Sequence, residues 1–272
     1  MLYLVGTPIG NMGDISPRAV ELLASCDLIA CEDTRRTGLL LKSIGVENKL
    51  FSYHEHNKAA KGSVLIDRLK NGDDICLVSD AGMPSISDPG EDLVKLCVEE
   101  EIEVSVVPGP VAAISALVLS GLDTRRYHFE GFLPSENKPR KERLAALKEI
   151  TETMIIYEAP HRLTKLIDEL IANGFGDSNA AFCRELTKKY EQVLRFTVNA
   201  AKDYFASVPP KGEFVVCLSP LPVREDDKAD IDIDEMISEL EAEGLSTKEI
   251  AACVSKATGL NKKDIYNHII ER

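Results

Sequence analysis

Three segments rich in glycine and proline each follow a short apolar run of the kind that forms a β-strand. They are Gly6–Gly13, Ser79–Gly90 and Val107–Pro110. Ligands of a parallel α/β sheet bind at the carboxyl ends of its strands, so three such ends are expected to converge on one crevice. The second segment also places the carboxylate of Asp80 beside a glycine. We therefore predict a ligand site that uses backbone groups, with Asp80 contacting the ligand rather than only capping a helix.

No single motif identifies the ligand. Gly6–Gly13 has the spacing Gly-x3-Gly-x2-Gly, which is neither a dinucleotide fingerprint nor a P-loop, and it is compatible with an ordinary tight turn. Glu32 and Asp33 follow the next strand-like run, where a dinucleotide-binding fold places its ribose-binding acid. A nucleoside-type cofactor, NAD included, is therefore compatible with these residues.

Other chemistries receive less support. The sequence lacks the Gly-x-Ser-x-Gly motif of a nucleophilic serine. His54 and His56 are spaced as on a surface strand, so we expect no metal site. The seven cysteines never form a Cys-x2-Cys pair, which is typical of reduced thiols in the cytosol.

The elements that must position these residues alternate between strands and helices. Ser16-Pro17 and Asp88-Pro89 each predict the cap and first residue of a helix. The apolar segment 111–119 predicts a buried helix. The alternation indicates an α/β layer with a largely parallel sheet. Its strands are predicted at 2–5, 27–31, 74–79 and 103–107.

A second αβ unit is expected after a linker at 131–139. The stretch 220–232 is acidic and flanked by proline, which predicts another linker. We therefore expect α/β domains at 1–122 and 123–222. The strands of the second domain are predicted at 153–157, 180–183, 192–197 and 213–218, and its helices at 140–150 and 162–171.

The C-terminal residues, 230–272, are expected to form a separate helical unit. Gly244 and Gly259 end two of its helices, Ser246–Glu249 is a capping box, and Asn261 caps the last helix. Three short helices with these turns resemble a helix-turn-helix bundle. The apolar positions are Ile233, Met236, Ile237, Leu240, Ile250, Ala251, Val254, Ile265, Ile269 and Ile270.

The chain of 272 residues is acidic, with a formal net charge of −13. A simple electrostatic nucleic-acid binder would be basic, so a polyanion is expected to bind the middle block, 121–222, which alone is not acidic. No apolar run approaches the ~20 residues of a membrane span. The N-terminus has no basic segment, so we expect no signal peptide.

A set of motifs in this order resembles the tetrapyrrole methylase superfamily. The most specific are Ser79-Asp-Ala-Gly82 and Tyr157-Glu-Ala-Pro-His-Arg162. From residue 2 to about 220 the chain is similar, more closely, to the branch that 2′-O-methylates a cytidine of 16S ribosomal RNA, and the helical tail fits that branch. Met83 and Val111 stand where this pattern has a threonine and a serine. The remaining motifs are 6–11, 32–35, 107–110, 183–188 and 212–214.

The resemblance implies two α/β domains with S-adenosylmethionine in the cleft between them, a helix-turn-helix-like tail and a homodimer. Asp80 would oppose the cationic end of the cofactor, whereas Tyr157 is equally compatible with a plain core position. The cofactor-binding residues that the resemblance implies are Thr7, Pro8, Asp80, Ala81, Gly82, Val111, Ala112, Tyr157 and Leu186.

A ribose hydroxyl is a poor nucleophile, so a nearby base or hydrogen-bond acceptor would assist methyl transfer. Asp33, Glu158 and Glu185 are the candidates, and the sequence does not choose between them. Each is equally compatible with a salt bridge. The local partners for such bridges are Arg35, Arg162 and Arg184.

The implied partner is 16S ribosomal RNA in the 30S subunit, in the cytoplasm. Basic side chains would contact phosphates and position the strand, although any single lysine is better explained as solvated charge. Asn261–Lys263 begins the helix that would meet nucleic acid, but the tail is acidic, so a packing or dimer-forming role is about as well supported. The candidate RNA-binding residues are Arg125, Arg126, Lys138, Arg140, Lys141, Arg143, Arg162, Arg184, Lys188 and Lys189.

Two other functions compete with this reading. One is a corrin-type small-molecule methyltransferase of the same superfamily, and the other is a nucleic-acid-binding regulator built around the tail. The helical tail, the basic residues near 131–139 and the Ser79–Gly82 motif disfavour the corrin reading.

Overall fold

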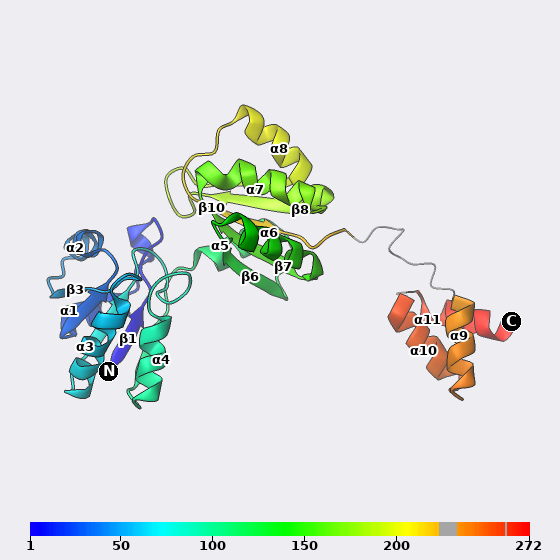
Figure 1. Ribbon diagram of the computed structural model, residues 1–272, viewed down its shortest axis with the longest axis horizontal. Coiled ribbons are helices and arrows are strands. Elements are labelled where there is room, and N and C mark those ends of the chain that lie inside the picture. The colour runs from blue at the N-terminus through cyan, green and yellow to red at the C-terminus, as the bar shows by residue number, and fades with distance from the viewer. Residues whose placement is uncertain (223–232, 259) are drawn as a thin grey trace. The chain divides into compact units, whose positions relative to one another are not determined.

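The computed structural model describes residues 1–222, 233–258 and 260–272. The chain divides into two compact units, Met1–Leu221 and Pro222–Arg272 (Figure 1). Most of the expected acidic linker and the expected helix end at Gly259 lie outside the described residues. The domain limits at 122, 222 and 230 stay predictions.

The first sheet consists of five parallel strands in the order β3-β2-β4-β1-β5, as expected from the alternation of strands and helices. Every residue of β2 and β4 is buried, because helices cover both faces of the sheet. Helices α1 and α2 pack on one face, and α3 and α4 on the other (Figure 1). The elements are β1 (Leu2–Val5), η1 (Met12–Asp14), α1 (Pro17–Ser25), β2 (Leu28–Cys31), α2 (Thr34–Ser43), β3 (Leu50–Ser52), α3 (Lys58–Lys70), β4 (Ile75–Val78), α4 (Glu91–Glu99) and β5 (Val104–Val107).

One of the two predicted helix starts is confirmed and the other is wrong. The Ser16 side chain accepts a hydrogen bond from the Ala19 N–H at 3.1 Å, and Pro17 is the first residue of α1. Helix α4 instead begins at Glu91, with Gly90 as its cap. Gly90 has a φ of 137°, which frees the preceding segment from the helix axis and leaves Asp88 in a loop.

The second sheet has the order β6-β7-β10-β8-β9, with β6 parallel to β7 and the other neighbours antiparallel. The linker expected at 131–139 is wrong, because β6 runs to Phe132 through an irregularity at Gly131, and α6 begins at Asn137. The elements are β6 (Tyr127–Phe132), α6 (Asn137–Ala146), η2 (Leu147–Glu149), β7 (Thr153–Glu158), α7 (Pro160–Ala172), η3 (Phe175–Asp177), β8 (Asn179–Arg184), β9 (Gln192–Thr197), α8 (Val198–Ser207) and β10 (Phe214–Leu218).

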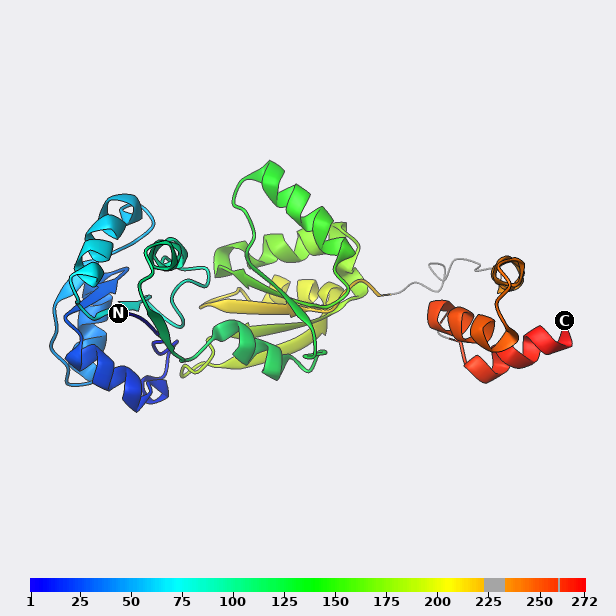
Figure 2. The same cartoon turned by 90° about the horizontal axis from the view of Figure 1, so that it is seen from below.

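Helix α5 (Ala112–Ser120) follows the last strand of the first sheet but packs on the second. Its buried face joins Ala116 and Leu117 to Ile155 and Cys217, on the face opposite α7 and α8 (Figures 1 and 2). The apolar composition of this segment predicted a buried helix, and this prediction holds for only one face of α5. The side chains of Ile114, Val118 and Leu119 are exposed.

The C-terminal unit contains α9 (Ile233–Ala242), α10 (Thr247–Thr258) and α11 (Lys262–Glu271). The caps at Ser246 and Asn261 are confirmed: the Ser246 N–H donates to Glu249 at 2.9 Å, and Asn261 accepts from the Lys263 N–H at 2.9 Å. Ile270 is exposed and takes no part in the core. The core consists of Ile237, Ile250, Ala251, Val254 and Ile265, with Ile233, Met236, Leu240 and Ile269 packed against it.

No helix among the described residues has the length and apolar character needed to cross a membrane.

Candidate active site

A cavity of about 380 Å³ lies where the strand ends of the first sheet meet the second sheet. The structure brings together seven of the nine residues expected to bind a cofactor: Asp80, Ala81, Gly82, Val111, Ala112, Tyr157 and Leu186. Thr7 and Pro8 are not among the lining residues, and Ile9 takes their place. The other lining residues were not among those nine, although Glu158 was a candidate base and Met83, Ile86, Ser87 and Asp88 belong to the segment 79–90 that was expected to reach the crevice. These other lining residues are Met83, Ile86, Ser87, Asp88, Phe132, Glu158, Ala159, Pro160, Cys183, Glu213, Phe214 and Val215.

The three glycine- and proline-rich segments converge, as predicted. Thr7 and Gly82 exchange backbone hydrogen bonds of 2.9 and 3.1 Å, which join the loop after β1 to the loop after β4. A Cβ on Gly109 would stand 2.7 Å from the Gly6 Cα, so the loops after β1 and β5 touch backbone to backbone. Thr7 is buried and does not line the cavity, so it contributes by joining the loops after β1 and β4.

The loop 82–90 is held in an uncommon backbone conformation. Ser85 and Ser87 have φ values of 71° and 61°, in the left-handed region that side chains other than glycine rarely adopt. Such residues cost about 1–3 kcal/mol each and cluster at functional sites. The buried Ser85 hydroxyl has no hydrogen-bond partner, which adds to the cost of this loop. Its conformation brings Ser87 and Asp88 to the cavity.

Asp80 is tied to the neighbouring strand end. Its Oδ1 accepts the Asp33 N–H at 3.1 Å, and its Oδ2 lies 3.1 Å from the Arg36 guanidinium. Both oxygens thus have protein partners, and the side chain fixes the start of α2 against the end of β4.

Tyr157 connects β7 to α5 across the cavity. Its hydroxyl accepts the Ala113 N–H at 3.1 Å, and its ring makes edge contacts with Phe129 and Phe132 at centroid distances of 5.3 and 5.4 Å. Burial raises the pKa of Tyr157, so the phenol keeps its proton at neutral pH. That proton can be donated to a ligand.

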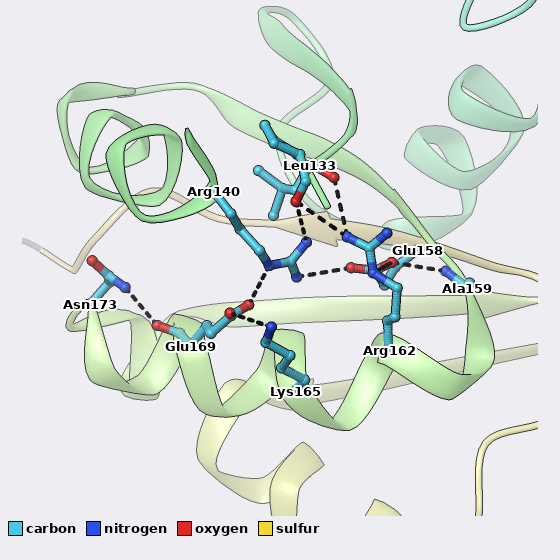
Figure 3. A network of polar contacts seen from close by, with 9 residues as sticks. Leu133, Arg140, Glu158, Ala159, Arg162, Lys165, Glu169 and Asn173 are labelled. Atoms are coloured by element: carbon cyan, nitrogen blue, oxygen red, sulfur yellow. Dashed lines mark hydrogen bonds and ion pairs between the residues drawn. The ribbon is translucent and has the colours of Figure 1, made fainter. Parts of the chain in front are cut away.

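A buried network of ion pairs includes Glu158, which lines the cavity (Figure 3). Arg140 donates to Glu158 at 3.0 Å and to Glu169 at 2.7 Å, and the side chains of Arg140 and Glu158 are each 1% exposed. Arg162 lies 3.3 Å from Glu158 and donates to the Leu133 carbonyl at 3.2 Å. The prediction that Arg140 binds RNA is wrong, because this guanidinium is buried and already paired.

The three acids proposed as bases each contact a cation. Hydrogen bonds from Arg35 lower the pKa of Asp33 to about 2. Burial raises the pKa of Glu185, but hydrogen bonds from the Glu213 N–H and from Lys188 leave it below its usual value. The salt-bridge partner of Glu185 is thus Lys188 rather than the expected Arg184. Of the three, Glu158 lines the cavity, whereas Asp33 and Glu185 are not among its lining residues.

The other basic residues expected to bind RNA fall into two groups. Arg143 pairs with Glu130, Lys188 with Glu185 and Glu213, and the Arg184 Nε donates to the Lys211 carbonyl at 2.6 Å. Five are exposed, although one of them, Arg125, also pairs with Asp123 at 2.7 Å. They are Arg125, Arg126, Lys138, Lys141 and Lys189.

Comparison with known proteins gives two family matches that cover most of the chain. The family described as Tetrapyrrole (Corrin/Porphyrin) Methylases matches residues 1–202, and the RsmI C-terminal HTH domain matches residues 227–272.

Curated relatives match from end to end. The Ribosomal RNA small subunit methyltransferase I of Synechocystis sp. is 43% identical over 100% of this chain and 98% of its own length. The protein of the same name from Escherichia coli O157:H7 is 40% identical over 100% of this chain and 95% of its own length.

Solved structures share the fold. Cobalt precorrin-4 methyltransferase CbiF has a TM-score of 0.59 at 17% identity, over 79% of this chain and 93% of that one. Diphthine synthase has a TM-score of 0.61 at 16% identity, over 80% of this chain and 89% of that one. The chain therefore belongs to the tetrapyrrole methylase family and, within it, to the group of small-subunit ribosomal RNA methyltransferases I.

Proposed function

We propose that this chain transfers a methyl group from S-adenosylmethionine to the ribose 2′-hydroxyl of a cytidine in 16S ribosomal RNA. The observation that carries the proposal is the end-to-end similarity to relatives of that name, with the helical tail included. We propose further that the substrate is 16S RNA within the 30S subunit. The enzyme would act as a homodimer in the cytoplasm.

The cavity suits this cofactor. Ile9, Val111 and Leu186 supply apolar surface of the kind that a purine covers. Asp80, Asp88 and Glu213 bring carboxylates to the same space, which suits a ligand with two positive charges. When bound, S-adenosylmethionine supplies a methyl group on a strongly electrophilic sulfonium.

The residues of the chain have to orient the acceptor and exclude water. Holding two reactants in a reactive geometry is worth roughly 7–11 kcal/mol of the barrier. The apolar walls displace water from the reacting centre. The exposed cations of the second domain, Lys141 among them, position the RNA through its phosphates.

Labelled S-adenosylmethionine distinguishes the candidate substrates. The purified protein is incubated with 30S subunits, with naked 16S RNA or with the corrin precursor uroporphyrinogen III, and the transferred methyl group is mapped by mass spectrometry. We expect a 2′-O-methylcytidine in RNA taken from the subunits. Transfer to the tetrapyrrole alone would contradict the proposal.

Removal of the tail tests its role in docking. A chain that ends after Leu221, at the boundary of the first compact unit, is expected to fold and to bind S-adenosylmethionine like the full chain. Methylation of 30S subunits should fall, because the tail no longer helps to dock the substrate. Equal methylation by both chains would refute the docking role, and aggregation of the shortened chain would make the tail structural.

The exposed lysines of α6 give a second test. Lys138→Gln with Lys141→Gln should weaken binding of the RNA substrate and reduce its log–log salt slope by about 0.7–0.9 per lost phosphate contact. Cofactor affinity should stay unchanged. Lys70→Gln with Lys95→Gln, in the first domain, is the matched control. An unaltered slope in the α6 variant would mean that these charges are merely solvated.

A further inference from the structure

A second cavity, of about 280 Å³, lies on the second sheet beside the end of α8. Its walls come from the end of β8, the first residues of β9 and β10, the last turns of α8 and the segment 208–211 that follows this helix. We call it the α8 pocket. It is separate from the cavity of the candidate active site, with which it shares a single lining residue, Phe214.

One row of side chains, in register across β7, β10, β8 and β9, joins the two cavities. Residues directly opposite one another on antiparallel strands present their side chains on the same face of the sheet. The first two members of the row line the cavity of the candidate active site, and the last three line the α8 pocket. A chain molecule bound at the first cavity can therefore continue along the row into the pocket. The row consists of Glu158, Phe214, Arg184 and Gln192.

The α8 pocket is cationic. Among the described residues that line it are Arg184 and Lys211, and no carboxylate. The Arg184 Nε donates to the Lys211 carbonyl at 2.6 Å, whereas its outer N–H groups and the Lys211 ammonium donate to no described residue. The neighbouring carboxylate of Glu185 accepts its hydrogen bonds from Lys188 and from the Glu213 N–H. Cations without a carboxylate partner, in a chain of net charge −13, favour an anion such as a phosphate.

The rest of the lining suits a nucleobase. Tyr204 is half-buried, and its ring packs against Phe196 and Phe205 at centroid distances of 5.2 and 5.1 Å, which fixes the plane of the ring. Gln192 is exposed, and its side-chain amide has no partner among the described residues, so it can both donate to and accept from the edge of a base. Unstacked bases of RNA are recognised by aromatic stacking and by hydrogen bonds to their edges.

We propose that the α8 pocket binds one unpaired nucleotide of the substrate RNA, close in sequence to the methylated cytidine, an inference that rests on the proposed function. Arg184 and Lys211 hold its phosphate. The Tyr204 ring stacks on its base, and Gln192 reads the edge of that base. The pocket thus adds specificity for the RNA and takes no part in methyl transfer itself.

Subunits with altered RNA test the reading by Gln192. 30S subunits are reconstituted from 16S transcripts in which each nucleotide close to the methylated cytidine is changed in turn, and kcat/KM is measured on each. We expect the wild-type protein to prefer one base at one of these positions by about 2- to 10-fold, the effect of a single hydrogen bond. Gln192→Leu should lose this preference and keep those at the other positions, which serve as the control.

The affinity of the labelled protein for 30S subunits, measured by fluorescence anisotropy, tests the other contacts. Lys211→Gln should lower the log–log salt slope by about 0.7, the value for one phosphate of a single strand. Lys148→Gln, which removes an exposed lysine outside the pocket, is the matched control. Tyr204→Ala should weaken binding by about 5- to 150-fold, whereas Tyr204→Phe, which keeps the ring and its packing, should match the wild type. Calorimetry should give all these variants the wild-type affinity for S-adenosylhomocysteine.

The outcomes are distinct. If Gln192→Leu keeps every base preference of the wild type, the inference is overturned and the proposed function stands. If Tyr204→Ala loses affinity for the subunit while Gln192→Leu keeps those preferences, the pocket holds a ribosomal protein segment, which also overturns the inference. Absence of any methyl transfer to ribosomal RNA by the wild-type protein refutes the proposed function and this inference with it.

Discussion

Arg140→Met should lower the free energy of unfolding by about 3–5 kcal/mol. The substitution leaves the carboxylate of Glu158 buried with a single cation, Arg162, and removes one of the two cationic partners of Glu169, which keeps Lys165. Breaking a buried ion pair by removing one member has a cost of this size, because the remaining charge stays desolvated. Urea unfolding of the full chain, followed by circular dichroism, measures the change.

Two control variants separate the network from the loss of a positive charge. Lys141→Met removes an exposed cation next to Arg140 and should change the unfolding free energy by less than about 0.5 kcal/mol. Arg140→Lys keeps the charge but not the two-sided guanidinium contact, so its stability should lie between those of the wild type and Arg140→Met. Wild-type stability of Arg140→Met would show that the network is dispensable for the fold.

Gly109→Ala should be destabilising even though it adds one methyl group. The new Cβ would stand 2.7 Å from the Cα and 2.8 Å from the carbonyl carbon of Gly6, and backbone atoms cannot rotate away. The loops after β1 and β5 must separate, which we expect to cost about 1–3 kcal/mol. Because these loops carry Ile9 and Val111, calorimetry should also detect weaker binding of S-adenosylmethionine.

Gly38→Ala is the matched control and should act with the opposite sign. Gly38 lies inside α2, and its added Cβ would meet only the Leu50 Cδ1, at 3.8 Å. Alanine favours a helix interior over glycine by about 0.8–1.0 kcal/mol, so this variant should be stabilised. Stability of Gly109→Ala at or above that of the wild type would refute the close approach of the two loops.

The sequence predicted the strands and the position of the site because both depend on local patterns. Short apolar runs between turn residues gave most of the strands, and the glycine- and proline-rich strand ends gave one wall of the cavity. β3 and β6 were missed because neither contains a buried apolar run: β3 has three half-buried residues, and the one buried residue of β6 is Gly131. The strand orders of both sheets depend on contacts between distant segments, which no local pattern encodes.

The two largest errors in the prediction of the site have the same origin, which is contact or backbone geometry that a local pattern does not encode. Lys138–Arg143 is a run of charges that is usually solvated, and the burial of Arg140 depends on Glu158 and Glu169, which belong to other elements. Asp88-Pro89 has the local signature of a helix start, but Gly90 takes the cap and leaves Asp88 in the cavity. Spacing alone does not distinguish a capping carboxylate from one turned into a site.

Helix α5 is synthesised before the sheet on which it packs. The first sheet is complete once β5 has been made, whereas the stripe of Ala113, Ala116 and Leu117 leaves the ribosome before any strand that will cover it. This stripe therefore has to wait for β7, β8 and β10, which arrive many residues later. For the same reason, a fragment that begins after α5 would lack the cover over its own sheet. A split of the chain into two fragments that reassemble should be placed ahead of α5, so that the helix is made together with the sheet on which it packs.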